Sequence, residues 1–215
     1  MDQRTKDVCA TFSHSESAPD TDPQSLFWAA SVPITFDADT HGTQQADLRT
    51  EVRCRWTFAN LYLLFSCAYS DNDPLYLKPD PDLLNETNEL WNWDVAEVFL
   101  GADPNNIRRY KEIEVSPQGE WVDVDVNLNQ PHHEHGWVWR SGCEVAARID
   151  DDQKVWFGFV RIPYVSLDSR PAAAGNALRV NFCRAHGTRH RLAVWQSTMS
   201  ATFHVPEVFG TLTLA

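Results

Sequence analysis

The chain has 215 residues, of which 43% are hydrophobic and 12% aromatic, and a formal net charge of −12. So acidic a chain, without a cluster of Lys and Arg, lacks the basic footprint that nucleic acids and anionic membrane surfaces require. No run of about 18 apolar residues occurs, so no transmembrane span is predicted. The length fits one β-rich domain, and we predict a single domain over residues 1–215.

Short strands separated by turns account for most of the sequence. They are predicted over residues 8–13, 31–37, 49–58, 61–69, 95–100, 110–115, 121–126, 144–149, 155–162, 178–184 and 209–214, with a short piece at 194–195. Residues 14–24 are predicted to be a loop, 24–30 a short helix, and 71–89 a long loop. This pattern predicts an all-β fold, an antiparallel β-sandwich (immunoglobulin- or jelly-roll-like) of two packed sheets with at most short helices.

The N-terminus and the cysteines bear on the compartment. The first residues contain no apolar core of a secretory signal, so the sequence as it stands predicts a cytoplasmic protein, or an exported one if a signal was removed. The five cysteines are an odd number without Cys-x-x-Cys spacing, which favours reduced core thiols. Cys54 and Cys67 flank a predicted hairpin, so one disulfide between them remains open for an exported protein.

The stretch from residue 90 to 126 organises the rest of the chain as a three-strand meander. Trp91 and Trp93 precede an apolar strand that carries a single carboxylate, Glu97. Period-two alternation places Tyr110, Glu112 and Glu114 on one face of the next strand. In the third strand we assign Val122, Val124 and Val126 to the core face, and Trp121, Asp123 and Asp125 to the acidic face.

That acidic face has two interpretations. It is either an ordinary solvated sheet face or a binding face for a ligand rich in hydroxyl groups. Glu97 lies in the most apolar of the three strands, where an unpaired charge is costly. We therefore expect Glu97 to have a partner, which is an arginine, a ligand hydroxyl or a metal ion.

Several segments, taken in order, resemble a known family. They are Asn60-Leu61-Tyr62-Leu63, Leu90-Trp91-Asn92-Trp93-Asp94, Glu97-Val98-Phe99-Leu100, Tyr110-Lys111-Glu112-Ile113-Glu114-Val115-Ser116-Pro117-Gln118-Gly119, Val160-Arg161-Ile162-Pro163, Arg179-Val180-Asn181-Phe182-Cys183-Arg184, Trp195-Gln196-Ser197 and Phe203-His204-Val205-Pro206-Glu207-Val208-Phe209-Gly210. Together they are similar to the family 9 carbohydrate-binding modules and their family 9-like relatives. The resemblance covers the chain from about Trp28 to Leu214.

The resemblance implies a β-sandwich related to the cytochrome-type sandwich domains of sugar dehydrogenases. In members of the family, a sugar end is held between two tryptophans, charged and amide side chains contact its hydroxyls, and calcium is bound structurally. The first tryptophan matches Trp91, the carboxylate matches Glu97, and the second tryptophan matches Trp195. The implied function is non-catalytic binding of a mono- or oligosaccharide.

The candidate ligand-binding residues follow from this match and from sugar chemistry, in which indole rings stack on pyranose faces and carboxylates bind hydroxyls. They are Trp91, Trp93 and Trp195 for stacking, and Glu97, Glu112, Asn181 and Arg184 for hydroxyl contacts. The competing interpretation places Trp93 and Trp195 in the core and uses Arg184 to neutralise Glu97 or Glu112.

Metal candidates are weaker. His133 and His135 could share a transition metal, although a solvated loop explains them as well. Structural calcium could lie among Asp71, Asp73, Asp80 and Asp82, or at Asp37 and Asp39, but without EF-hand spacing.

Two rival functions stay open. A haem or electron-transfer sandwich would need axial ligands such as Met199 and His204, and no Cys-x-x-Cys-His motif is present. A glycan-processing enzyme would need paired carboxylates, in which case Glu97→Gln and Glu112→Gln would abolish turnover. Because the sequence has no hydrolase motif, we favour a non-enzyme.

Overall fold

The computed structural model describes residues 7–130 and 139–215. Within these ranges it contains twelve strands: β1 (Asp7–Phe12), β2 (Ile34–Phe36), β3 (Thr50–Trp56), β4 (Asn60–Ala68), β5 (Val95–Gly101), β6 (Arg109–Val115), β7 (Trp121–Asn127), β8 (Glu144–Asp150), β9 (Val155–Pro163), β10 (Ala177–His186), β11 (Arg191–Val194) and β12 (Gly210–Leu214). The helical elements are α1 (Tyr164–Leu167) and the 3-10 turns η1 (Ala46–Leu48), η2 (Leu90–Asn92) and η3 (Pro206–Val208). Among the described residues, no helix has the length and apolar character to span a membrane. The all-β class with short helices is confirmed.

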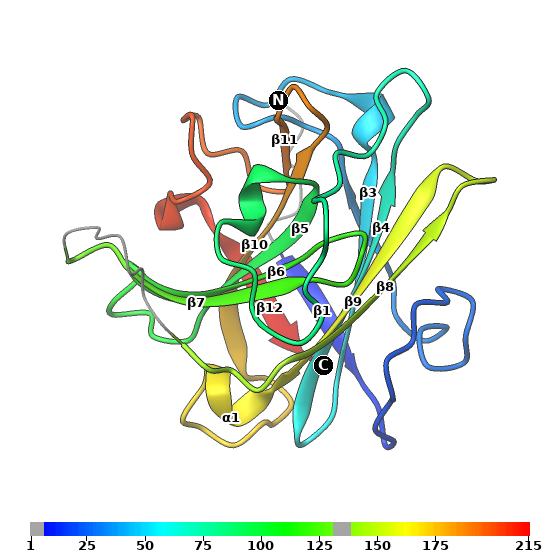
Figure 1. Ribbon diagram of the computed structural model, residues 1–215. Coiled ribbons are helices and arrows are strands. Elements are labelled where there is room, and N and C mark those ends of the chain that lie inside the picture. The colour runs from blue at the N-terminus through cyan, green and yellow to red at the C-terminus, as the bar shows by residue number, and fades with distance from the viewer. Residues whose placement is uncertain (1–6, 131–138) are drawn as a thin grey trace.

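The strands form one hydrogen-bonded path, β7-β6-β5-β10-β12-β1-β3-β4-β9-β8, with β11 beside β10 and β2 beside β3. In Figure 1, β6 and β7 run across the direction of β8 and β9, so the two ends of the path cover each other. β6 contacts both β8 and β9. At this contact a Cβ added to Gly158 would meet Val115 Cγ1 at 2.8 Å, which explains why β9 carries glycine there.

Two details differ from the predicted sandwich of separate antiparallel sheets. The strand β1 joins the two halves, because residues 7–10 pair with β12 and residues 11–12 pair with β3. Both pairings are parallel, so the sheet is mixed. A parallel pair needs a long connection, and both partners of β1 lie far along the chain. The period-two pattern identifies strands but does not give the direction of their neighbours.

The strand predictions match the structure within a few residues, and residues 14–24 contain no strand or helix, as predicted. The helix predicted over 24–30 is wrong. That segment is a run of turns in which Trp28 and Ala29 both donate backbone hydrogen bonds to the Ser25 carbonyl. The Trp28 side chain is nevertheless fully buried, packed against Tyr62 and Phe159, which satisfies the apolar pattern without a helix.

The main core fills the space between the two halves. It takes side chains from β3, β4 and β9 on one side and from β5, β6, β10 and β12 on the other. The thiols of Cys54 and Cys67 are both free and buried within it. Cys54 lies opposite Leu63, whereas Cys67 lies opposite Thr50, a spacing along the strand of roughly 13 Å. A disulfide cannot bridge that distance, so the pairing considered from the sequence does not occur.

Candidate functional site

Three glutamates meet on the outer face of β5 and β6. Glu97 lies directly opposite Glu114, and Glu112 follows two positions along the same face. The β6–β7 register places Val124 opposite Glu112 and Val122 opposite Glu114. The assignment of Val122, Val124 and Val126 to the core face was therefore wrong. These valines share the acidic face, because the length of the 116–120 loop sets a register that pairs them with the glutamates.

The acidic triad, which we define as Glu97, Glu112 and Glu114, is almost completely buried, with 3%, 6% and 0% of each residue exposed. Each of the three offers a carboxylate oxygen, and these oxygens lie within 4.8 Å of one another. Burial, followed by repulsion from Glu112, raises the pKa of Glu97 well above its ordinary value. Burial, followed by repulsion from Glu97 and Glu112, also raises the pKa of Glu114 well above its ordinary value. Burial also raises the pKa of Glu112, although His204 acts against it.

A cavity of about 580 Å³ opens over this face. Its inner wall is formed by buried residues, namely Glu97, Glu112, Val122, Ala185, Phe203 and Asp123, whose carboxylate accepts a hydrogen bond from Ser141. Its rim is formed by exposed residues, namely Glu86, Asn88, Trp91, Arg108, Gln130, His190, Ala201 and Thr202. The cavity thus joins the carboxylates of Glu97 and Glu112 and an apolar wall to solvent, a combination typical of small-ligand sites.

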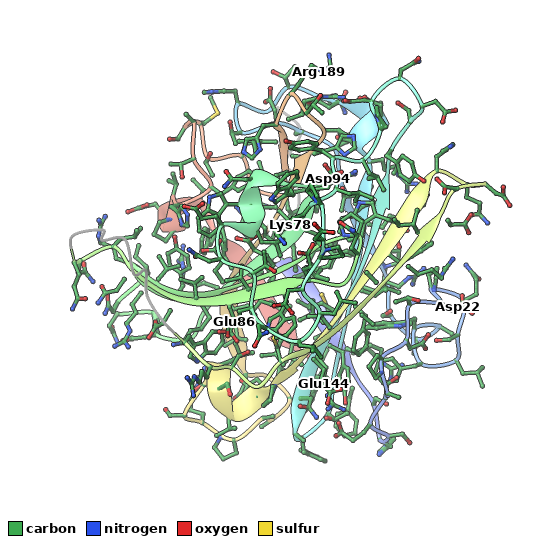
Figure 2. All side chains as sticks on the ribbon, viewed as in Figure 1. Asp22, Lys78, Glu86, Asp94, Glu144 and Arg189 are labelled. Carbon is green, nitrogen blue, oxygen red and sulfur yellow. The ribbon has the colours of Figure 1, made fainter. Side chains whose placement is uncertain are left out.

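Trp91 stands at the rim on η2 and is 39% exposed. The residue that anchors this turn is Asp94, which is 1% exposed. Its carboxylate accepts hydrogen bonds from the backbone N–H of Gly187 at 2.6 Å and of Tyr76 at 3.2 Å, and it lies 2.6 Å from His186 Nδ1. Figure 2 shows Asp94 at the start of β5, between the 71–89 loop and the end of β10. These bonds fix the rim tryptophan relative to the sheet.

The same network continues into the 187–190 turn. His186 Nε2 lies 3.1 Å from the Asp73 carbonyl oxygen, and the Asp73 carboxylate accepts from Arg189 at 3.0 Å and from Arg191 at 2.8 Å. Although burial acts to raise it, these guanidinium groups hold the pKa of Asp73 below its ordinary value. We call Asp73, Asp94, His186, Arg189 and Arg191 the hairpin network. Each carboxylate in it has a cationic or N–H partner.

The other predicted stacking residues lie away from the cavity wall. The Trp93 ring packs on Tyr76 with centroids 4.5 Å apart and does not line the cavity. Trp195 is 3% exposed and packs in the core against Phe182. The match of Trp195 to a second binding tryptophan is therefore not supported by its position. Apart from Trp91 and two histidines, the aromatic residue that lines the cavity is Phe203.

Asn181 and Arg184 are also placed elsewhere. The Asn181 amide is fully buried, where it accepts from the Gln196 N–H at 2.9 Å and donates to the Gln196 carbonyl at 3.1 Å. Arg184 lies opposite Ala96 and hence on the core face, with no surface exposed. Its guanidinium contacts Thr50 and His186. Arg184 therefore neither lines the cavity nor neutralises Glu97 or Glu112, because adjacent strand residues point to opposite faces.

Sequence reasoning missed the part of the wall that comes from residues 201–204. His204 lines the cavity, its ring stacks on Phe99, and its Nδ1 lies 2.7 Å from the Tyr110 hydroxyl. Met199, considered as a haem ligand, is 69% exposed and is not among the cavity residues. The only available signal was that the Phe203-His204 segment belongs to the family resemblance, although the second tryptophan was sought at Trp195.

The predicted metal sites do not assemble. Asp71 pairs with Lys154, while Asp73 belongs to the hairpin network, so they do not converge. Asp39 and Asp82 accept backbone N–H bonds within their own turns. His133 and His135 lie outside the described residues. Within the described ranges, the one group of three or more acidic, His or Cys ligands close enough to share an ion is the acidic triad.

Comparison with solved structures gives the same fold. A family 9 carbohydrate-binding module from Caldicellulosiruptor kristjanssonii, in complex with cellotriose, matches with a TM-score of 0.67 and 12% identity over 97% of this chain and 93% of that one. The same kind of module in complex with glucose gives a TM-score of 0.66 at 11% identity, over 97% and 95%. A putative carbohydrate-binding protein from Bacteroides uniformis gives 0.74 at 13% identity, over 98% and 99%.

At the sequence level, an extracellular protein from Arthroderma benhamiae is 23% identical over 190 residues, which is 82% of each chain. The family model described as "Carbohydrate family 9 binding domain-like" matches residues 24–215, nearly the whole chain and all the elements that build the cavity. This protein belongs to the carbohydrate family 9 binding domain-like family.

Proposed function

We propose that the protein binds a mono- or oligosaccharide non-catalytically in the cavity over β5 and β6, with Trp91 stacking on a sugar ring and Glu97 and Glu112 accepting bonds from its hydroxyls. The observation that carries the proposal is that a half-exposed indole and two buried carboxylates line the same cavity. Pyranose rings have an apolar face and an edge of hydroxyl donors, so they complement such a surface.

The relatives support this choice of ligand. The two Caldicellulosiruptor modules are in complex with cellotriose and glucose, and family membership extends over the cavity-forming strands. The volume of about 580 Å³ is in the range of pockets that enclose small ligands. Val122 and Phe203, which line the same cavity, supply further apolar surface for a sugar ring.

The test is a titration of tryptophan fluorescence with glucose, cellobiose, cellotriose and a panel of other soluble sugars. We expect a saturable change with at least one sugar, which Trp91→Ala abolishes because the stacking surface is removed. Trp93→Phe is the matched control, since it keeps a ring packed on Tyr76 and changes an indole that does not line the cavity. It should bind as the wild type does.

Isothermal titration calorimetry with the best sugar then tests the carboxylates. Glu112→Gln keeps the shape of the side chain and should weaken binding by about tenfold or more, as for the loss of a charge-assisted hydrogen bond. The proposal fails if no sugar in the panel binds, or if Trp91→Ala binds with unchanged affinity.

A further inference from the structure

We propose that the sugar which binds in the cavity carries a protonated amino group, and that Glu97 and Glu112 bind this ammonium group. The inference rests on the proposed function, since it names the class of sugar for the same cavity. It separates a cationic amino sugar from neutral sugars such as glucose and cellotriose, with which the similar modules are in complex.

Glu97 is the carboxylate that carries the inference. It is 3% exposed and lines the cavity, and it has no hydrogen bond or ion pair within the described ranges. In the two neighbouring strands the residues opposite it are Cys183 and Glu114, a thiol and another carboxyl group. A buried carboxylate without a donor is costly, so a ligand that brings N–H donors and a positive charge into the cavity relieves this cost.

Glu112 adds negative charge to the same wall. Its carboxyl group shares a hydrogen bond with that of Glu114. One proton is enough for that bond, so the pair keeps one negative charge while Glu97 can supply another. The titratable group that faces Glu112 from the 201–204 segment is His204, which acts to lower the pKa of Glu112 and whose Nδ1 lies 2.7 Å from the Tyr110 hydroxyl.

The other charged side chains of the cavity lie at its rim or point away from it. Glu86 is a further carboxylate at the rim, where His190 also lies, and the exposed Arg108 donates to the Leu128 carbonyl at 2.8 Å. The Asp123 side chain points to the other face of the sheet, since the neighbouring valines line the cavity. Among the described residues that line the cavity, carboxylates therefore outnumber guanidinium groups, and no lysine is present.

The spacing of the two glutamates fits an ammonium group. Carboxylate oxygens of Glu97 and Glu112 lie within 4.8 Å of one another. A tetrahedral ammonium group that donates to two oxygens at about 2.8 Å holds them roughly 4.6 Å apart, so one nitrogen can donate to both. A hydroxyl group has a single proton to donate and no charge. Trp91 lines the same cavity, and an indole face attracts both a pyranose ring and a cation.

The experiment compares glucosamine, glucose and N-acetylglucosamine by isothermal titration calorimetry of the full chain at about pH 6.5. The amine of glucosamine is protonated at this pH, glucose lacks it, and acetylation removes its charge. Glucosamine should bind about tenfold more tightly than the other two, as for the gain of a charge-assisted hydrogen bond. Sodium chloride at physiological ionic strength screens the general attraction of cations to a chain with a net charge of −12.

The same titrations at about pH 9.5 change the charge of the ligand without changing its shape. An amine of the α-amino type has lost its proton at that pH, whereas the carboxylates stay ionised. The preference for glucosamine over glucose should therefore disappear. Neither this comparison nor the comparison of sugars needs a variant protein.

Glu97→Gln assigns the ammonium site. It keeps the shape of the side chain and removes its charge, so the ratio of glucosamine affinity to glucose affinity should fall by about tenfold. The matched control is Glu120→Gln, which changes an equally buried carboxylate that is bound by Ser116, Thr87 and Lys78 outside the cavity. It should leave the ratio unchanged. Glucose binding by each variant shows that its cavity is folded.

The outcomes separate this inference from the proposed function. If glucosamine binds no more tightly than glucose, or N-acetylglucosamine binds as tightly as glucosamine, the inference is overturned while sugar binding stands. If no sugar binds, both are overturned. The assignment to Glu97 is overturned if Glu97→Gln keeps the full preference for glucosamine.

Discussion

Two groups of buried carboxylates in this protein differ in what surrounds them. Asp94, in the hairpin network, is 1% exposed and is bound by two backbone N–H groups and by His186. Glu114, in the acidic triad, is equally buried, yet its nearest charged neighbours are two more carboxylates. Asp94 and Glu114 are therefore equally buried, but only the charge of Asp94 is compensated by donor groups.

The difference separates a structural role from a binding role. In the hairpin network the protein supplies every cation itself, and the result is a fixed junction between the 71–89 loop, β5 and the 187–190 turn. In the triad the compensating charge must come from protons or from a ligand. The comparison predicts opposite responses to the removal of one carboxylate from each group.

The largest effect is expected for Asp94→Ala. It leaves His186 and two backbone N–H groups without their acceptor in a buried site, which we expect to reduce the free energy of unfolding by about 3–5 kcal/mol. Urea unfolding monitored by circular dichroism measures this change. Glu144→Ala, which removes an exposed ion pair with Arg161, is the control and should cost about 1 kcal/mol or less. Equal losses for the two variants would contradict the structural role of the network.

Glu114→Gln should change stability in the opposite direction. The amide removes a buried charge and can donate to a neighbouring carboxylate, so we expect the free energy of unfolding, measured with urea, to rise by about 1–3 kcal/mol. A loss of stability would show that the Glu114 carboxylate already has a partner that compensates its charge.

The stability gained through Glu114→Gln should depend on pH in a direction that the pKa of Glu114 determines. The pKa of Glu114 is raised by burial above its ordinary value of 4.5, so the folded state holds the proton more tightly than the unfolded chain. Its contribution to stability is complete below about pH 4.5 and falls as the pH rises toward the folded pKa. The difference between Glu114→Gln and wild type should therefore be near zero below that pH and largest at neutral pH. Urea unfolding at a series of pH values tests this prediction, and a difference that does not change with pH would contradict a raised pKa for Glu114.

The sequence predicts the strands well because alternation is a local property. It also predicts that Trp91 and Glu97 share a site, since six residues and one turn separate them. The same alternation could also have placed the Arg184 side chain on the core face. Val180 and Phe182 are core residues. Arg184 lies two positions beyond Phe182 in the same strand, so its side chain points into the core as well.

The remaining errors arise from longer-range structure. The register between β6 and β7 depends on how the 116–120 loop closes, and a shift of one residue moves Val122 to the opposite face. His204 reaches the cavity over Phe99 from a segment that is 105 residues away in sequence (204 − 99). No local pattern encodes that contact, because the path through β10, β11 and β12 determines it.

The smallest predicted effect lies at the edge of the hairpin network. Arg189 is 68% exposed at its side chain and shares the Asp73 carboxylate with Arg191, which is 19% exposed; Figure 2 shows Arg189 at the tip of the β10–β11 turn. Arg189→Ala should reduce the free energy of unfolding by about 1 kcal/mol or less, since solvent screens its charge and Arg191 still compensates Asp73. Arg191→Ala should cost more, because it also removes the bonds to Asp47 and Gln45. Urea unfolding of both variants shows which substitution lowers the free energy of unfolding more. The reverse order would mean that the exposed guanidinium, and not the buried one, balances Asp73, and that the network is less self-sufficient than its hydrogen bonds indicate.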